Sequence, residues 1–205
     1  MLPPSITLAS ANANKSREFE ALLGGVRVEP MPSGFRLPEE TGSGFNENAR
    51  LKAMAVRDQF IARATAFDGK VPWVMADDSG IEVAALAGAP GIYSARYAGE
   101  NATDVDNVSK LLEALEGKDD RRARFVCEIV AISPGGEQLH ASGALEGGIA
   151  RKPRGGFGFG YDPVFIPQGY SLTVSELSAD EKNRISHRAR AAQDLLNQLR
   201  GGKSS

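Results

Sequence analysis

The sequence predicts an α/β or α+β fold with a mixed β-sheet, carried by one domain. Short apolar runs typical of strands alternate with stretches in which apolar residues recur every three or four positions, as in amphipathic helices. Two of the apolar runs flank a Pro-Gly-Gly segment, which is a hairpin signal. No linker rich in Pro and Gly divides the 205 residues, so we expect a single domain over 1–205 with loose ends at 1–4 and 201–205.

The N-terminal part of the chain is expected to contain two short strands and two helices. Residues 5–10 form the first strand, and the helix that follows it ends at Gly24-Gly25, because glycine favours helix C-termini. Residues 26–28 form a second strand, and residues 31–44, rich in Pro, Gly and Glu, form a loop. Residues 45–64 carry the longest helical pattern, with an apolar stripe along one face.

The middle of the chain is expected to contain a buried strand and a third helix. Residues 71–76 are apolar throughout, and the strand that they predict ends in Asp77-Asp78-Ser79-Gly80. Residues 81–86 continue as strand or turn. Residues 103–115 repeat apolar side chains at helical spacing.

The C-terminal part is expected to contain a hairpin, a short strand and a long helix. Residues 124–132 and 139–145 are apolar runs on either side of Pro134-Gly135-Gly136. Residues 164–166 form a last strand. The segment from Ser178 to Glu181 fits a capping box and begins a helix that runs to about Leu199.

Composition and charge exclude several classes of function. The formal net charge is −2, which gives no bulk attraction to nucleic acids or anionic membranes. No apolar stretch approaches the roughly 20 residues that span a bilayer, and residues 1–4 do not resemble a signal peptide. Cys127 is the only cysteine and lies in an apolar run, so no internal disulfide can form. We expect a cytoplasmic protein without a nucleic-acid or membrane partner.

The first candidate site is the turn Ser10-Ala11-Asn12-Ala13-Asn14-Lys15. A strand, a tight turn and a helix place backbone N–H groups at a helix N-terminus, which suits a phosphate group. Lys15 can supply a positive charge, and Ser10 and Asn12 can donate hydrogen bonds. The spacing of a P-loop is absent. The alternative is an Asn-rich turn that only caps a helix.

Two acidic segments form the second and third candidate sites. The first, Asp77-Asp78-Ser79-Gly80, follows a buried strand, and ligand sites in α/β sheets form at strand ends. Adjacent carboxylates point to different sides, so one can bind a metal or activate water while the other is structural. The second, Glu39-Glu40-Thr41-Gly42, can complete a site for Mg²⁺, which takes one or two carboxylates with phosphate oxygens and waters. The alternatives are a turn that favours Asp, Ser and Gly, and a solvated acidic loop.

Two further segments can recognise a base. Residues 155–163 alternate glycines with aromatic side chains, and stacking on a base contributes about 1–3 kcal/mol. Asp162 can accept a hydrogen bond from a ring N–H. Near a helix N-terminus lie the cations Lys182, Arg184, His187 and Arg188, whose charges oppose the helix dipole unless an anion or polar ligand binds there. The alternatives are a glycine-rich hairpin with core aromatics and a structural histidine.

Taken together and in this order, these segments resemble the inosine/xanthosine triphosphate pyrophosphatases, enzymes that remove non-standard purine nucleotides. The resemblance covers roughly Ile6 to Leu199. The family motifs T-G-N-x-x-K, E-T-G, E-N-A-x-x-K-A, A-D-D-S-G-L, F-G-Y-D-P and E-K-x-x-I-S-H-R correspond to residues 10–15, 40–42, 47–53, 76–81, 159–163 and 181–188, and residues 88–97 form a further family signature.

The resemblance implies a long, bent mixed sheet flanked by helices, with two lobes and the active-site cleft between them. It also implies a homodimer, a requirement for Mg²⁺ and the products nucleoside monophosphate and pyrophosphate. Asp78 would be the general base, and Glu40 and Asp78 would bind the metal. The residues implied for substrate binding are Ser10, Ala11, Asn12, Ala13, Asn14, Lys15, Lys52, Ser79, Phe159, Gly160, Tyr161, Asp162, Lys182, His187 and Arg188.

The chain departs from the family pattern at three places. Ser10-Ala11 replaces Thr-Gly, Asn14 replaces a frequent Gly, and Phe157 stands where a Gly is usual. None of these changes removes a charged catalytic group. Glu39 lies beside Glu40, so the sequence leaves open which acid is the metal ligand.

Two other functions stay open at this stage. One is a pyrophosphatase for modified pyrimidine or 7-methylguanine nucleotides, and the other is a non-catalytic nucleotide or nucleic-acid binding module. Hydrogen-bond donors from His187, Arg188 or Lys182 would favour the 6-oxo group of hypoxanthine and xanthine over the amine of adenine. How GTP, which shares that oxo group, would be excluded does not follow from the sequence.

Overall fold

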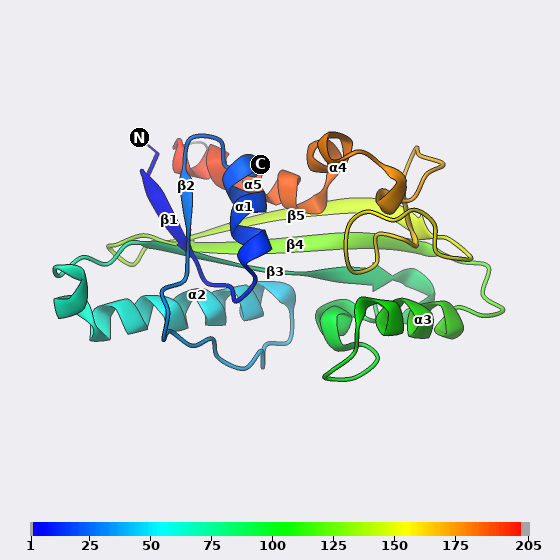
Figure 1. Cartoon of the computed structure of the whole chain (residues 1–205), viewed down its shortest axis with the longest axis horizontal. Coiled ribbons are helices and arrows are strands. Elements are labelled where there is room, and N and C mark those ends of the chain that lie inside the picture. Colours follow the sequence, from blue (N-terminus) through cyan, green and yellow to red (C-terminus); the bar gives the residue numbers. More distant parts are fainter. Residues whose placement is uncertain (1, 202–205) are drawn as a thin grey trace. The chain divides into compact units, whose positions relative to one another are not determined.

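A computed structural model describes residues 2–201, apart from the side chains of Ala13 and Asn14. Within this range, strands form one mixed sheet in the order β2-β1-β3-β4-β5-β6 (Figure 1). The strands are β1 (Ser5–Leu8), β2 (Arg27–Pro30), β3 (Trp73–Val83), β4 (Arg122–Ile132), β5 (Gln138–Ile149) and β6 (Phe165–Pro167). The helices are α1 (Ala13–Leu22), α2 (Phe45–Ala62), α3 (Asp104–Ala114), α4 (Ala179–Ile185) and α5 (His187–Leu199).

Parallel and antiparallel pairs occur in the same sheet. β1 pairs in parallel with both β2 and β3, whereas β5 and β6 are antiparallel. The turn at residues 133–137, closed by hydrogen bonds between Ser133 and Glu137, connects β4 to β5. The prediction of an α/β fold with a mixed sheet is therefore confirmed.

The described residues fall into two compact units. Unit 1 contains residues 2–78, 127–143 and 188–201, and unit 2 contains residues 79–126 and 144–187. The strands β3, β4 and β5 contribute residues to both. The lobes and the cleft implied by the resemblance stay predictions, as does the single domain.

In unit 1, helices cover the two faces of the sheet (Figure 1). On one face, Met75 of β3 belongs to a core cluster with side chains of α1 and α5, such as Phe19 and Leu195. On the other face, Ala76 of β3 packs with side chains of α2, such as Val56. Successive side chains of a strand point to opposite faces. Asp77 therefore points to the same face as Met75, towards α1 and α5, and Asp78 points to the same face as Ala76, towards α2.

Unit 2 has its own core. Side chains of β3 and α3, such as Ile81 and Leu111, pack with Phe165 of β6. Helix α3 begins where the sequence predicts, because Thr103 and Asp106 form a capping box. The buried hydroxyl of Tyr161 donates a hydrogen bond to the carbonyl of Ser94 at 2.8 Å, which attaches the loop before β6 to this core.

Two predicted boundaries are wrong. The strand that was expected to end before Asp77 continues to Val83, so Asp77 and Asp78 lie inside β3. Pairing and burial of the apolar side chains beyond them outweigh the turn preference of Asp-Ser-Gly. The long C-terminal helix is interrupted at Ser186, whose extended backbone separates α4 from α5. Ser186 thus directly precedes the helix that begins with His187.

The N-terminal segment is attached to the core instead of lying loose. Leu2 packs against the cluster of unit 1, Pro3 is buried, and the carbonyl of Pro4 accepts a hydrogen bond from Arg27. Residues 202–205 of the expected C-terminal loose end lie outside the described residues. Over residues 2–201, the helices are too short or too polar to cross a bilayer.

Candidate active site

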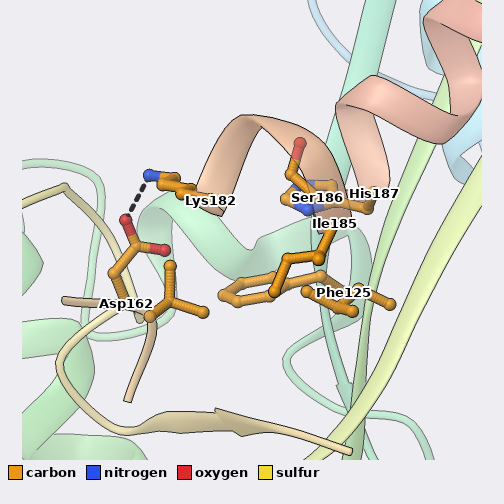
Figure 2. Close-up of a pocket in the computed structure, with 8 residues that line it drawn as sticks. Phe125, Asp162, Lys182, Ile185, Ser186 and His187 are labelled. Carbon is orange, nitrogen blue, oxygen red and sulfur yellow. Dashed lines mark hydrogen bonds and ion pairs between the residues drawn. The ribbon is translucent and has the colours of Figure 1, made fainter. Parts of the chain in front are cut away.

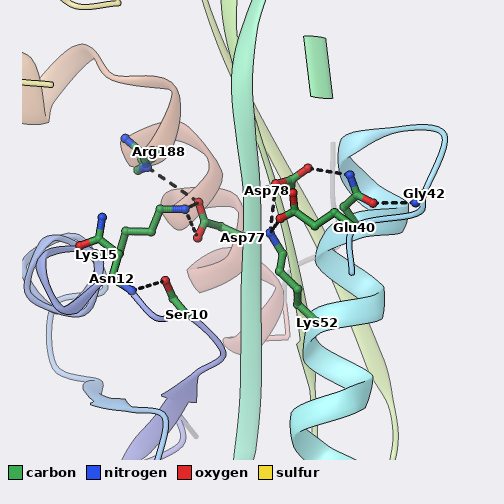
Figure 3. A network of polar contacts seen from close by, with 10 residues as sticks. Ser10, Asn12, Lys15, Glu40, Gly42, Lys52, Asp77, Asp78 and Arg188 are labelled. Carbon is green, nitrogen blue, oxygen red and sulfur yellow. Dashed lines mark hydrogen bonds and ion pairs between the residues drawn. The ribbon is translucent and has the colours of Figure 1, made fainter. Parts of the chain in front are cut away.

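Asp77 is a buried anchor on one face of β3 (Figure 3). Only 2% of the residue is exposed, and both carboxylate oxygens accept hydrogen bonds from Lys15 Nζ, at 2.9 and 2.8 Å. Arg188 Nε lies 3.9 Å from the same carboxylate. Burial alone would raise the pKa of Asp77, but the charges of Lys15 and Arg188 lower it to about 2. Asp77 is thus a permanent anion that holds α1 and α5 to β3.

Asp78 lies on the opposite face of β3, against α2, and has different partners. Lys52 Nζ donates to one carboxylate oxygen at 3.0 Å, and Asn48 Nδ2 donates to the other at 3.2 Å. Burial raises the pKa of Asp78 above its ordinary value, because the Lys52 ammonium offsets only part of the cost and the Glu40 charge adds to it. Of the two aspartates, Asp78 is the one suited to accept a proton.

Glu40 joins this second cluster through Lys52, whose Nζ donates to Glu40 Oε1 at 2.8 Å (Figure 3). Burial alone would lower the pKa of Lys52, but Asp78 and Glu40 raise it above its ordinary value, so the side chain is a cation. Glu39 is exposed. Glu40, and not Glu39, lies beside the cation that contacts Asp78, so the geometry favours Glu40 as the candidate metal ligand.

The donor set fits a magnesium ion. Glu40 and Asp78 share one cation, the Lys52 ammonium, so both carboxylates are within reach of a single positive centre. Mg²⁺ binds one or two carboxylates and completes its shell with phosphate oxygens and waters. Over residues 2–201, no group of three or more His, Cys, Asp or Glu side chains could hold a metal. A metal bound here would need ligands from a substrate or from water.

The predicted phosphate turn is present at the N-terminus of α1. The N–H of Asn12 donates to Ser10 Oγ at 3.1 Å, and the N–H of Lys15 donates to the carbonyl of Asn12 at 3.1 Å. Ala11 and Asn12 are exposed, so the turn is accessible to a ligand. The side chains of Ala13 and Asn14, which were also predicted to bind substrate, are not among the described parts of the structure.

In unit 2, the glycine-rich loop forms a separate polar cluster around Asp162. Lys182 Nζ contacts Asp162 at 2.6 Å and lies 4.6 Å from the centre of the Phe159 ring. The N–H of Phe159 donates to Asp162 Oδ2 at 3.0 Å. A Cβ on Gly158 would lie 2.2 Å from the same oxygen, and its φ of 91° also favours glycine, so only glycine fits there. Phe159 remains 47% exposed and presents a ring to solvent.

His187 is buried in unit 2 beside an aromatic residue that the sequence did not single out. The Phe125 ring stacks on His187, with centroids 4.9 Å apart and planes at 16°. Both line a small pocket with Asp162 and Lys182 (Figure 2), whose cavity volume is about 10 Å³. That is room for about one water. Unless the pocket widens, the purine base of a nucleotide would have to lie on the exposed Phe159 ring instead. Phe125 lies in β4. Sequence reasoning missed it because the apolar run around it predicted a strand and gave no sign of a ligand site.

The remaining predicted residues have structural partners. Gly160 donates its N–H to Asp104 at 2.7 Å. Tyr161 is buried and anchors its loop through the hydroxyl described above. Ser79 follows Asp78 in β3 and is half-buried. Asn48, which the sequence placed in a motif without a role, contacts Asp78 directly.

Comparisons with known proteins find similar sequences over nearly the whole chain. The model of the Ham1 family matches residues 6–198. A dITP/XTP pyrophosphatase of Methylacidiphilum infernorum is 43% identical over 199 residues, which cover 95% of this chain and 94% of the relative. A dITP/XTP pyrophosphatase of Bacillus subtilis is 45% identical over 194 residues, covering 92% and 93%.

Solved structures resemble the fold over nearly its whole length. The Ham1 protein of Staphylococcus aureus superposes with a TM-score of 0.84 at 42% identity, covering 97% of this chain and all of that chain. A nucleoside-triphosphatase, or dITP/XTP pyrophosphatase, of Mycobacterium abscessus has a TM-score of 0.72 at 37% identity, covering 94% and 98%.

Proposed function

This chain belongs to the Ham1 family, and from that premise we propose that it hydrolyses non-standard purine nucleoside triphosphates to the nucleoside monophosphate and pyrophosphate. The substrates we expect are ITP, dITP and XTP, whose removal keeps the altered bases out of DNA and RNA. The observation that carries the proposal is the buried carboxylate of Asp78, whose pKa is raised by burial although Lys52 is beside it.

Asp78 acts as the general base in this proposal. It takes a proton from the water whose oxygen bonds to the α-phosphorus, and the bond from that phosphorus to the bridging oxygen breaks as pyrophosphate leaves. A base works best when its pKa lies closer to the working pH, which the burial of Asp78 favours. Asp77 is excluded from the role because Lys15 and Arg188 lower its pKa to about 2, which makes it a poor proton acceptor.

The cations of unit 1 bind the triphosphate. Phosphoryl transfer depends mainly on positioning and on neutralising charge. Lys52 of α2 lies beside Asp78, so its ammonium can contact phosphate oxygens near that residue. Lys15, at the phosphate turn, lies beside Asp77 on the other face of β3 and can contact a phosphate bound at the turn. Arg188 at the start of α5 adds a third positive charge beside Asp77. We expect Ser10 and Asn12 to donate hydrogen bonds to the same phosphates.

Glu40 and Asp78 would hold the magnesium ion. When bound, Mg²⁺ would neutralise phosphate charge and help to orient the leaving pyrophosphate. These two carboxylates fit it because they already share one cation, Lys52. Lys52 lies beside both carboxylates and would also be placed to contact the triphosphate.

Unit 2 would recognise the base. The exposed ring of Phe159 offers a stacking face, and Lys182 and His187 offer donors to a 6-oxo group. Adenine carries an amine at that position, so ATP leaves these donors without an acceptor. Arg188 would contribute to the same recognition.

The experiment that tests the function is pyrophosphate release from ITP, dITP, XTP, ATP and GTP, with Mg²⁺ and with EDTA. We expect release from the first three, slow release from ATP and GTP, and none with EDTA. Preference for a modified pyrimidine or 7-methylguanine nucleotide would replace the substrate class. Nucleotide binding without turnover would mean that the protein is a binding module and not an enzyme.

We further propose that the enzyme is a cytoplasmic homodimer. The resemblance to its family supports the dimer, and the single buried thiol of Cys127 fits a reducing compartment. Sedimentation equilibrium of the purified protein tests the dimer, and a mass of one chain at micromolar concentration would refute it.

A further inference from the structure

Asn48 is a fully buried amide on α2 that has no part in the steps described above. It is the fourth residue of the helix, its exposed fraction is 0%, and its backbone N–H donates to Gly44. Buried amides occur where their hydrogen bonds are satisfied.

The two ends of the Asn48 amide bind two different segments. Its Oδ1 accepts a hydrogen bond from the N–H of Gly42 at 2.8 Å, and its Nδ2 donates to Asp78 Oδ2 at 3.2 Å (Figure 3). Gly42 is two residues from Glu40 in the same loop. One buried side chain therefore connects the loop that carries Glu40 to the strand that carries Asp78.

Gly42 permits this connection because it lacks a side chain. A Cβ there would lie 2.6 Å from Asn48 Oδ1, 2.9 Å from Glu47 Cβ and 3.0 Å from Asn48 N. The two contacts under 3.0 Å would force the side chains of Asn48 or Glu47 to move, and the backbone N of Asn48 at 3.0 Å leaves little room for the loop to shift towards the helix. The glycine thus allows the loop to approach the amide closely.

Lys52, one helical turn after Asn48, holds the other oxygen of Asp78 and also contacts Glu40. Both carboxylate oxygens of Asp78 are consequently bound from the same face of α2. We infer that Asn48 is a positioning residue, which fixes the Glu40 loop and the Asp78 carboxylate relative to each other so that both can bind one divalent cation. The inference rests on the proposed function of these two acids.

The test is the affinity of the full-length protein for Mn²⁺ alone, without nucleotide, measured by electron paramagnetic resonance of the free ion. Asn48→Leu removes both hydrogen bonds at similar volume. Gly42→Ala leaves Asn48 in place and displaces the loop. We expect each change to weaken Mn²⁺ binding by about tenfold or more, because partners that orient metal ligands typically contribute about 10- to 100-fold.

Asn107 provides a matched control in unit 2. It is 3% exposed, its Oδ1 accepts from the N–H of Ala98 at 2.8 Å, and its Nδ2 donates to the carbonyl of Ala95 at 3.1 Å. Asn107→Leu removes the same kind of buried bridge without a carboxylate. We expect it to lower the melting temperature while leaving the Mn²⁺ affinity unchanged.

The outcomes separate this inference from the proposed function. Unchanged Mn²⁺ affinity in Asn48→Leu, or an equal loss in Asn107→Leu, overturns the positioning role. A wild type that binds no Mn²⁺ also overturns it, since there is then no site to position. A wild type that releases no pyrophosphate, but loses Mn²⁺ affinity on Asn48→Leu, refutes the proposed function and supports the positioning role.

Discussion

The two faces of β3 carry the same residue type with opposite electrostatic consequences. Asp77 faces α1 and α5, and its charge is matched by Lys15 and Arg188, so its pKa falls to about 2. Asp78 faces α2, shares Lys52 with Glu40, and its pKa is raised. Both residues are buried.

The difference teaches that the number of nearby acids, and not burial alone, decides the role of each carboxylate. On the Asp77 face, two cations, Lys15 and Arg188, lie against the one aspartate, although Arg188 also lies 3.8 Å from Glu18. On the Asp78 face, one ammonium serves two acids, so the cluster keeps a negative charge that a divalent cation or a proton can neutralise. Asp77 is therefore placed to contribute to stability, and Asp78 is the aspartate on which the proposed chemistry depends.

The largest effect that would sharpen this comparison is on turnover. Asp78→Asn keeps the shape of the side chain and loses the base, so kcat for ITP is expected to fall by about 10²-fold or more, since general bases contribute about 10²–10⁴. Steady-state pyrophosphate release measures it. Turnover close to that of wild type would show that Asp78 is not the general base, and the proposed difference between Asp77 and Asp78 would be wrong.

The second effect is on stability. Asp77→Asn leaves Lys15 and Arg188 without their shared anion, and breaking a buried ion pair costs about 3–5 kcal/mol. Urea unfolding in metal-free buffer measures the loss. Asp78→Asn is the internal control, because neutralising a carboxylate with a raised pKa should not lower stability. Equal losses in both variants would contradict the division of roles.

The third effect is a pH dependence carried by Asp77. Its folded pKa of about 2 lies below its ordinary value of 3.8, so its contribution is fully present above pH 4 and is lost as the pH falls through 2. The shift corresponds to about 2 kcal/mol. The gap in unfolding free energy between wild type and Asp77→Asn should shrink by that amount from pH 5 to pH 2. A constant gap would mean that the pKa of Asp77 is the same in the folded and the unfolded protein, so that Lys15 and Arg188 do not lower it.

The smallest effect distinguishes two adjacent acids on the Asp78 side. Glu40→Gln should raise the Mg²⁺ concentration for half-maximal activity by about tenfold or more, because even partners that only orient metal ligands contribute about 10- to 100-fold. Glu39→Gln, which alters an exposed side chain, should leave it unchanged. Titration of activity with Mg²⁺ at saturating ITP checks both. The reverse result would mean that Glu39, and not Glu40, is the metal ligand.

Local patterns predicted most of the secondary structure. The capping residues of α3, the apolar stripe of α2 and the turn between β4 and β5 are local features, and each element formed where they indicated. The errors occurred where distant partners decided the outcome. Asp77-Asp78 was expected to end a strand, yet Lys15 and Lys52 supply the charges that allow two acids inside β3.

The sequence by itself determined the fold class and the order of the motifs, because these depend on residue type and spacing. Together with the resemblance to a family, it also supplied the candidate acids and cations of the site. Tertiary structure decided which aspartate is an anchor, that Glu40 and not Glu39 reaches Lys52, and that Asn48 joins two segments. It also decided that Phe125 stacks on His187. The physical reason is that pKa values and hydrogen-bond partners depend on distances between residues far apart in the chain, and only folding sets those distances.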